Sequence, residues 1–276
     1  MGTVPFGTAG TVPTGTVPKG TVPFGTAGGR LALEIAVQDA AGALVAQAGG
    51  ADRVELCSAL SATGGVTPSA ALIDAVVAVG LPVHVLIRCR PGPFVYSAEE
   101  IRVMAADAAW AMAHGTAGVV FGALTPDCLI DKQAMAAVQD AAAGRISCHR
   151  AMDVAIGAGQ ADAGLDALAG LGVIRVLTSG GAKRSIDGVA MLTRLVERAQ
   201  GRLEIMAGGG VDPADIAALA ATGIDAVHLS ARSARDAGLR AGLSTGPGGG
   251  AEVTVDVTDA GIVLAAAEAV AAVGQS

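Results

Sequence analysis

The stretch Arg145-Ile146-Ser147-Cys148-His149-Arg150-Ala151-Met152-Asp153 decides the fold, because a short strand-like run ends here in several titratable side chains. The chain is 52% hydrophobic and only 16% charged, so such a polar group stands out. All strands of a (β/α)8 barrel end on one face, where their last side chains build the site. The stretch therefore predicts a barrel strand that delivers His149, Arg150 and Asp153 to that face.

Seven further apolar runs follow the same plan, and Ala-rich segments of helical character separate them. The eight predicted strands are Leu31–Ala36, Arg53–Cys57, Val83–Arg88, Gly118–Phe121, Arg145–His149, Ile174–Thr178, Leu203–Ala207 and Ala226–Leu229. The predicted helices lie near Asp39–Ala48, Pro68–Val79, Ala98–His114, Asp131–Ala142, Ala161–Ala169, Ser185–Ala199, Pro213–Ala221 and Asp259–Val273. Thr67-Pro68 and Asp212-Pro213 are typical helix starts, and Ser97 with Glu100 is a capping box. This alternation predicts a parallel α/β sheet, and eight units favour a closed TIM barrel as a single domain over residues 31–276.

Composition narrows the class of protein further. The formal net charge is −7 without a block of like charge, which argues against nucleic-acid partners. No apolar stretch of about 18 residues is uninterrupted, so we expect no membrane span. The four cysteines show no C-x-x-C spacing, and reduced thiols in a cytoplasmic protein are the expectation.

Residues 1–30 differ from the rest of the chain. Gly-Thr-Val-Pro occurs four times in this segment, and the repeated Pro and Gly prevent a helix. We expect a disordered repeat tail that contributes nothing to the fold. A linker and translated upstream sequence are the alternatives.

Side chains on alternate strand positions face the interior of a barrel. If His149 points inward, one parity collects the polar residues Glu34, Glu55, Cys57, Arg88, Ser147, His149 and His228. Charged groups are rarely buried unless they are paired. One hypothesis is a structural ion network that plugs the barrel, and the other is a ligand or catalytic site at its mouth.

Glycine-rich segments follow the last three strands. They contain Thr178, Ser179 and Gly180 after the sixth strand, Gly208, Gly209 and Gly210 after the seventh, and Ser230 and Arg232 after the eighth. Many barrels bind phosphate with the loops after strands seven and eight, because backbone N–H groups there favour an anion. We expect an anion pocket at this position, with simple tight turns as the alternative.

Seven motifs, in order, resemble those of the CutC family. They are Leu33-Glu34-Ile35, Ala51-Asp52-Arg53-Val54-Glu55-Leu56-Cys57, Gly64-Gly65-Val66-Thr67-Pro68-Ser69, Pro82-Val83-His84-Val85-Leu86-Ile87-Arg88, His149-Arg150-Ala151-Met152-Asp153, Arg175-Val176-Leu177-Thr178-Ser179-Gly180 and Met206-Ala207-Gly208-Gly209-Gly210-Val211. The resemblance covers about Leu31 to Arg240. It implies a TIM barrel, a cytoplasmic homodimer or higher homo-oligomer, and Cu(I) binding in copper homeostasis by cysteines at the ends of the first two strands.

Here Ala36 stands where the family pattern has its first-strand cysteine, so Cys57 is the remaining candidate copper ligand. The alternative is a lyase or isomerase acting on a small phosphorylated or carboxylated metabolite. In that case Glu34 or Glu55 would be the general base and His149 an acid or base, and Arg88 would hold the anion. The neighbouring Arg150 and Asp153 complete the candidate catalytic set.

Overall fold

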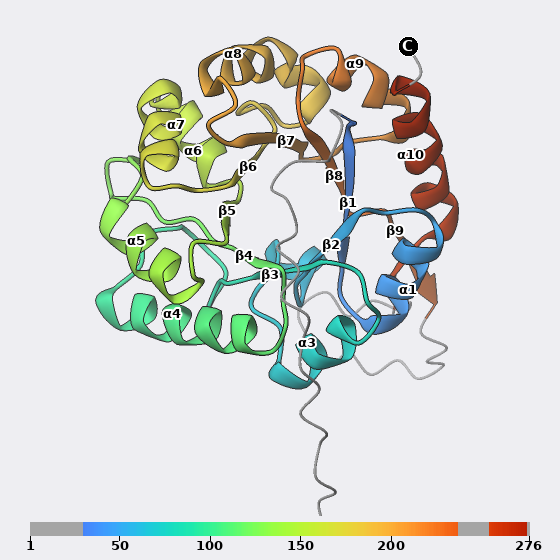
Figure 1. The fold of residues 1–276 in the computed structure, drawn as a ribbon, viewed down its shortest axis with the longest axis horizontal. Coiled ribbons are helices and arrows are strands. Elements are labelled where there is room, and N and C mark those ends of the chain that lie inside the picture. The colour runs from blue at the N-terminus through green and yellow to red at the C-terminus, as the bar shows by residue number, and fades with distance from the viewer. Residues whose placement is uncertain (1–29, 237–253, 275–276) are drawn as a thin grey trace, which may run out of the picture.

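A computed structural model describes residues 30–236 and 254–274 of the chain, and it confirms the predicted TIM barrel. Eight parallel strands close into a barrel in chain order, with β8 paired to β1 (Figure 1). The strands are β1 (Ala32–Val37), β2 (Arg53–Leu56), β3 (Val83–Leu86), β4 (Gly118–Val120), β5 (Ile146–Cys148), β6 (Arg175–Thr178), β7 (Glu204–Gly208) and β8 (Ala226–Leu229).

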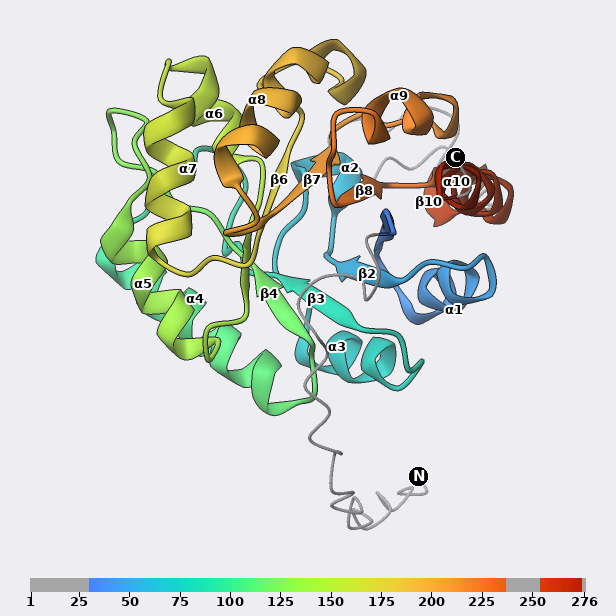
Figure 2. The ribbon, with the colours of Figure 1, turned by 45° about the horizontal axis from the view of Figure 1, so that its top comes forward.

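Apart from the short helix Leu60–Thr63, which packs against apolar residues inside the barrel, the helices form a ring outside the strands, as Figures 1 and 2 show. They are α1 (Ala40–Ala48), α2 (Leu60–Thr63), α3 (Ala70–Val77), α4 (Ala98–Ala113), α5 (Lys132–Ala141), α6 (Ala151–Gly157), α7 (Ala161–Gly170), α8 (Val189–Ala199), α9 (Ile216–Ala220) and α10 (Ala260–Val273). Short 3₁₀ turns, Ser185–Gly188 and Pro213–Asp215, precede α8 and α9. The expected repeat tail lies outside the described residues, except for Arg30 at its end.

Local hydrogen bonds explain where the helices begin. At α4 the predicted capping box is present, with Ser97 and Glu100 each accepting the other's backbone N–H. The predicted start of α3 at Thr67-Pro68 is wrong, because Thr67 instead exchanges hydrogen bonds with the backbone of Arg88. The Ser69 hydroxyl accepts the N–H of Leu72 and caps this helix.

Four elements of the described residues, two helices and two strands, were not predicted from the sequence. Helix α2 follows β2, and α6 begins directly after β5, where only a loop with site residues was expected. After β8, the strands β9 (Arg232–Asp236) and β10 (Thr254–Thr258) pair as an antiparallel ribbon. The ribbon contacts α1 beside the barrel.

The apolar core lies mainly between the barrel and its helices. It is built from Ala, Val, Leu and Ile on the outward strand parity and on the inner helix faces. Among the described residues, two small apolar clusters lie inside the barrel: Ala32, Leu177, Met206 and Ala226 in one, and Cys57, Leu86 and Val120 in the other. The remaining interior is polar, so charged groups fill a space that is usually apolar.

Candidate functional site at the mouth of the barrel

The lower half of the barrel interior holds a buried ion network. Arg53 Nε donates to Glu34 Oε2 at 2.6 Å, and Arg175 Nε donates to Glu204 Oε2 at 2.6 Å. Weaker contacts of 3.9 Å cross between the two pairs. This layer is balanced, with two guanidinium groups facing two carboxylates.

Sequence reasoning missed Arg53, Arg175 and Glu204 in this network. Arg53 lies two residues before Glu55, so the same strand parity would have placed it inside. The structural hypothesis of an ion network therefore describes the lower layer of the barrel.

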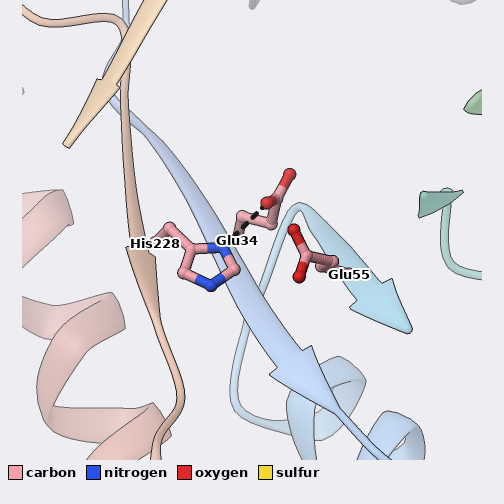
Figure 3. Close-up of side chains that lie close together, drawn as sticks. All are labelled: Glu34, Glu55 and His228. Atoms are coloured by element: carbon pink, nitrogen blue, oxygen red, sulfur yellow. Dashed lines mark hydrogen bonds and ion pairs between the residues drawn. The ribbon is translucent and has the colours of Figure 1, made fainter. Parts of the chain in front are cut away.

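At the top of this layer, Glu34 on β1 also converges with Glu55 from β2 and His228 from β8 (Figure 3). Glu34 Oε1 lies 2.9 Å from His228 Nδ1. Atoms of all three residues that could bind a metal lie within 4.8 Å of one another. Glu55 Oε2 is buried and has no hydrogen-bond partner among the described residues.

The two carboxyl groups ionise differently. Burial opposes ionisation of Glu34, but Arg53, His228 and Arg175 outweigh it and hold its pKa well below the usual range. Burial raises the pKa of Glu55 to about 7, which His228 opposes. For His228, burial lowers the pKa, but the bond to Glu34 and the charge of Glu55 raise it overall. A carboxyl group whose pKa lies near 7 and which stands beside an imidazole is suited to proton transfer.

A cavity of about 280 Å³ opens at the carboxyl ends of the strands above this group. The residues that line it include Glu55 and His228, together with Arg88, His149 and Arg150. The cavity thus brings together residues that the sequence predicted for the site.

Arg88 is held in the cavity wall by backbone carbonyl groups. Its two terminal nitrogens donate to the carbonyl oxygens of Thr63, Gly65 and Gly92, at 2.8–2.9 Å. Its guanidinium carbon lies 5.2 Å from the centre of the Phe94 ring. Within the described ranges Arg88 forms no ion pair, and its Nε has no hydrogen-bond partner. A buried cation without a carboxylate favours an anion in the adjoining cavity.

His149 lines the same cavity as Arg88 but differs from it in charge. Its Nδ1 accepts the backbone N–H of Ala151 at 3.1 Å, and its ring lies 4.5 Å from that of Phe94. Burial and the charge of Arg88 lower the pKa of His149 to about 3. The imidazole is therefore neutral in the folded protein.

Some residues of the expected anion pocket line the cavity and others do not. Gly209, Gly210, Ser230 and Arg232 line the cavity, although Arg232 also pairs with Asp256 at 2.9 Å. Gly208 lies at the end of β7, where an added Cβ would be 2.2 Å from a Leu177 methyl carbon.

Thr178, Ser179 and Gly180 do not line this cavity. Their loop binds an anion of the protein itself, because Asp153 Oδ1 accepts the N–H groups of Ser179 and Gly181 and the Thr178 hydroxyl. Arg150 Nε donates to Asp153 Oδ2 at 2.6 Å. Asp153 thus holds the loop after β6 against α6, and it places Arg150 at the edge of the cavity.

Cys57 lies beside this site but does not line the cavity. Its side chain is fully buried with Leu86 and Val120, and burial together with Glu55 raises its thiol pKa. Cys148 faces the helix layer, as predicted, and burial raises its pKa to about 12. A single protonated thiol is a poor match for Cu(I), which favours thiolates. The oxygen and imidazole donors of Glu34, Glu55 and His228 suit harder divalent ions such as Mg²⁺, Mn²⁺ or Zn²⁺ better.

Comparison with known proteins places this barrel in a family. A model of the CutC family matches residues 31–233. The chain belongs to the CutC family. The human copper homeostasis protein cutC homolog is 42% identical over 211 residues, which are 75% of this chain and 76% of the human protein. A CutC family protein of Agrobacterium fabrum is 47% identical over 188 residues, covering 68% of this chain and 73% of that protein.

Among solved structures, CutC from Streptococcus agalactiae is similar to this CutC barrel, with a TM-score of 0.68 and 31% sequence identity. The match covers 72% of this chain and 98% of the streptococcal chain. In the described ranges of this CutC-family protein, no helix is long and apolar enough to cross a membrane.

Proposed function

We propose that this CutC-family protein binds a small anionic metabolite at the mouth of its barrel and moves a proton on it, as a lyase or isomerase does. One observation carries the proposal. Arg88, a buried cation without a carboxylate partner in the described residues, shares one small cavity with Glu55, whose Oε2 is buried without a hydrogen-bond partner among those residues.

The cavity favours a small, anionic ligand. Its volume of about 280 Å³ lies just below the usual range of ligand pockets, which suits a metabolite of few heavy atoms. Arg88 supplies positive charge, and Gly209, Gly210 and Ser230 bring the loops after β7 and β8 to the same opening. A phosphate or a carboxylate group meets these requirements.

Glu55 is the residue best placed to accept the proton. Buried carboxylates are strong bases because the charged form is poorly solvated, and Glu55 has no cation directly bound to it in the described residues. Glu34 orients His228 through Nδ1, which leaves Nε2 of His228 to return a proton or to bind the ligand. Glu34 itself is engaged by Arg53, so we assign it a positioning role.

The test is a screen of phosphorylated and carboxylated metabolites for thermal stabilisation and turnover. We expect a ligand that stabilises the wild type and Glu55→Gln alike but reacts only with the wild type. Arg88→Gln should lose the stabilisation, whereas Arg90→Gln, which removes a cation paired with Glu100 outside the cavity, should keep it. The proposal fails if the metabolites stabilise no variant, or if Glu55→Gln turns the ligand over at the wild-type rate.

Copper(I) binding is the second candidate, and family membership favours it. Cys57 would supply the thiolate, with further ligands from His149 or a second subunit. Anaerobic Cu(I) titration against a competing chelator tests this role, with Cys148→Ala as the control because Cys148 faces the helix layer. Tight binding lost in Cys57→Ala but kept in Cys148→Ala supports the copper role, and binding indifferent to Cys57 refutes it.

We also propose that the protein is a cytoplasmic homodimer, as its resemblance to the CutC family implies. Reduced, unpaired cysteines fit a reducing compartment. Light scattering on the purified protein tests the dimer, and a monomeric mass would contradict it.

A further inference from the structure

We propose that His149 is a neutral hydrogen-bond donor which, together with Arg88, binds one carboxylate or phosphoryl oxygen of the ligand. The inference deepens the proposed function and rests on it for the presence of an anion in the cavity. It assigns the anion to Arg88 and His149, at the ends of β3 and β5, and leaves the acid–base chemistry to Glu55 and His228, which line the same cavity.

The hydrogen bond at Nδ1 determines the state of the ring. Nδ1 of His149 faces the backbone N–H of Ala151 at 3.1 Å, so it must act as an acceptor. A neutral imidazole with an acceptor at Nδ1 carries its proton on Nε2. Protonation of Nδ1 would turn two donors toward each other beside the positive charge of Arg88, and the pKa of about 3 agrees with this geometry.

Two donors in the cavity wall lack partners among the described residues. They are Nε2 of His149 and Nε of Arg88, and the two side chains are only 6% and 7% exposed. A buried donor without a partner is costly, and such groups are rare in folded proteins. Both residues line the same cavity, and we assign an oxygen of the bound ligand to this pair of donors.

The surrounding residues hold both donors in place. Phe94 packs against both side chains, with its ring 4.5 Å from the His149 ring and 5.2 Å from the Arg88 guanidinium carbon. Gly122, just beyond β4, makes room for the imidazole, because an added Cβ would lie 2.7 Å from Nδ1 and Cε1 of His149. This fixed pair differs from a flexible surface cation, since neither donor has to be ordered when the ligand binds.

A neutral imidazole also sets the charge of this subsite. Arg88 provides one positive charge, and His149 adds a donor without a second charge. The pair therefore complements an oxygen that carries or develops one negative charge, as in a carboxylate, a phosphoryl group or an enolate. In this arrangement His149 does not serve as the general acid or base that the sequence suggested.

Nuclear magnetic resonance of ¹⁵N-histidine in the full chain tests the inference, with inorganic phosphate and acetate as probes. We expect the His149 ring to keep the Nε2–H tautomer from pH 8 to pH 5 and its Nε2–H signal to shift when a probe binds. His149→Gln, which retains a donor near Nε2, should bind the effective probe within about threefold of wild type. His149→Leu should bind it about tenfold more weakly, as expected for one lost hydrogen bond.

The outcomes separate this inference from the proposed function. Titration of His149 near pH 6.5, an unshifted Nε2–H signal, or equal probe binding by His149→Leu overturns the inference. A response to phosphate alone or to acetate alone identifies the anionic group. If a probe binds as expected but no metabolite is turned over, the anion subsite stands and the enzymatic proposal fails.

Discussion

Replacing Glu55 with glutamine should stabilise the folded protein at alkaline pH. Glu55 is buried, and its pKa is raised from 4.5 to about 7, with burial as the main cause. The folded state therefore binds this proton more tightly than the unfolded state does. Stability from this group is fully present below pH 4.5 and is lost as the pH rises through 7.

The size of the effect follows from the two pKa values. A rise from 4.5 to about 7 corresponds to about 3 kcal/mol of unfolding free energy that Glu55 removes above pH 7. Glutamine has nearly the same shape and no charge, so Glu55→Gln should gain about 3 kcal/mol at pH 8.5 and almost nothing at pH 4.5. For a domain of this size the gain corresponds to roughly 6–12 °C in Tm.

Urea unfolding of the wild type and Glu55→Gln at pH 4.5 and pH 8.5 measures this difference. Glu268→Gln on α10 is the matched control, because it makes the same substitution at an exposed position outside the barrel. If Glu55→Gln is less stable than the wild type at pH 8.5, then Glu55 is an ionised partner in a structural network. That result would refute both the reasoning and the basic role proposed for Glu55.

Three further changes test the surrounding structure. Gly208→Ala should cost about 1–3 kcal/mol in urea unfolding, because its Cβ would overlap Leu177, and an unchanged midpoint would contradict the packing. Asp153→Asn should weaken the loop after β6 by about 1.5–3 kcal/mol, seen as faster amide exchange at Ser179, and unaltered protection would refute its anchoring role. Ser97→Ala should lower stability by about 1 kcal/mol through loss of the α4 cap while leaving ligand binding unchanged.

The barrel was predictable because its strands and helices have different periods. Alternation of apolar runs with Ala-rich segments gave all eight strands to within one or two residues, and parity placed Glu34, Glu55, Arg88 and His149 inside. The same rule covers Arg53, which was overlooked because only the carboxyl ends of the strands were considered. The lower layer, in which charged residues pair with one another, was therefore not predicted.

The roles of individual side chains were less predictable, because they depend on partners distant in sequence. Glycines and hydroxyls after β6 suggested a site for an external anion, but Asp153, 26 residues before Ser179, already occupies those amides. The neutral state of His149 depends on the position of the Ala151 N–H, which requires α6 to begin immediately after β5. No local motif specifies either contact.

The two layers of the barrel interior differ in one respect that bears on function. In the lower layer Arg53 and Glu34 have formed their ion pair, whereas above it Arg88 and Glu55 remain apart although they line one cavity. Carbonyl groups of the loops hold the Arg88 guanidinium in place, so the protein itself prevents the two charges from pairing. Such separation costs stability, which is typical of groups preorganised for a ligand. An anion with an acidic proton would satisfy both, with its oxygens on Arg88 and its proton on Glu55.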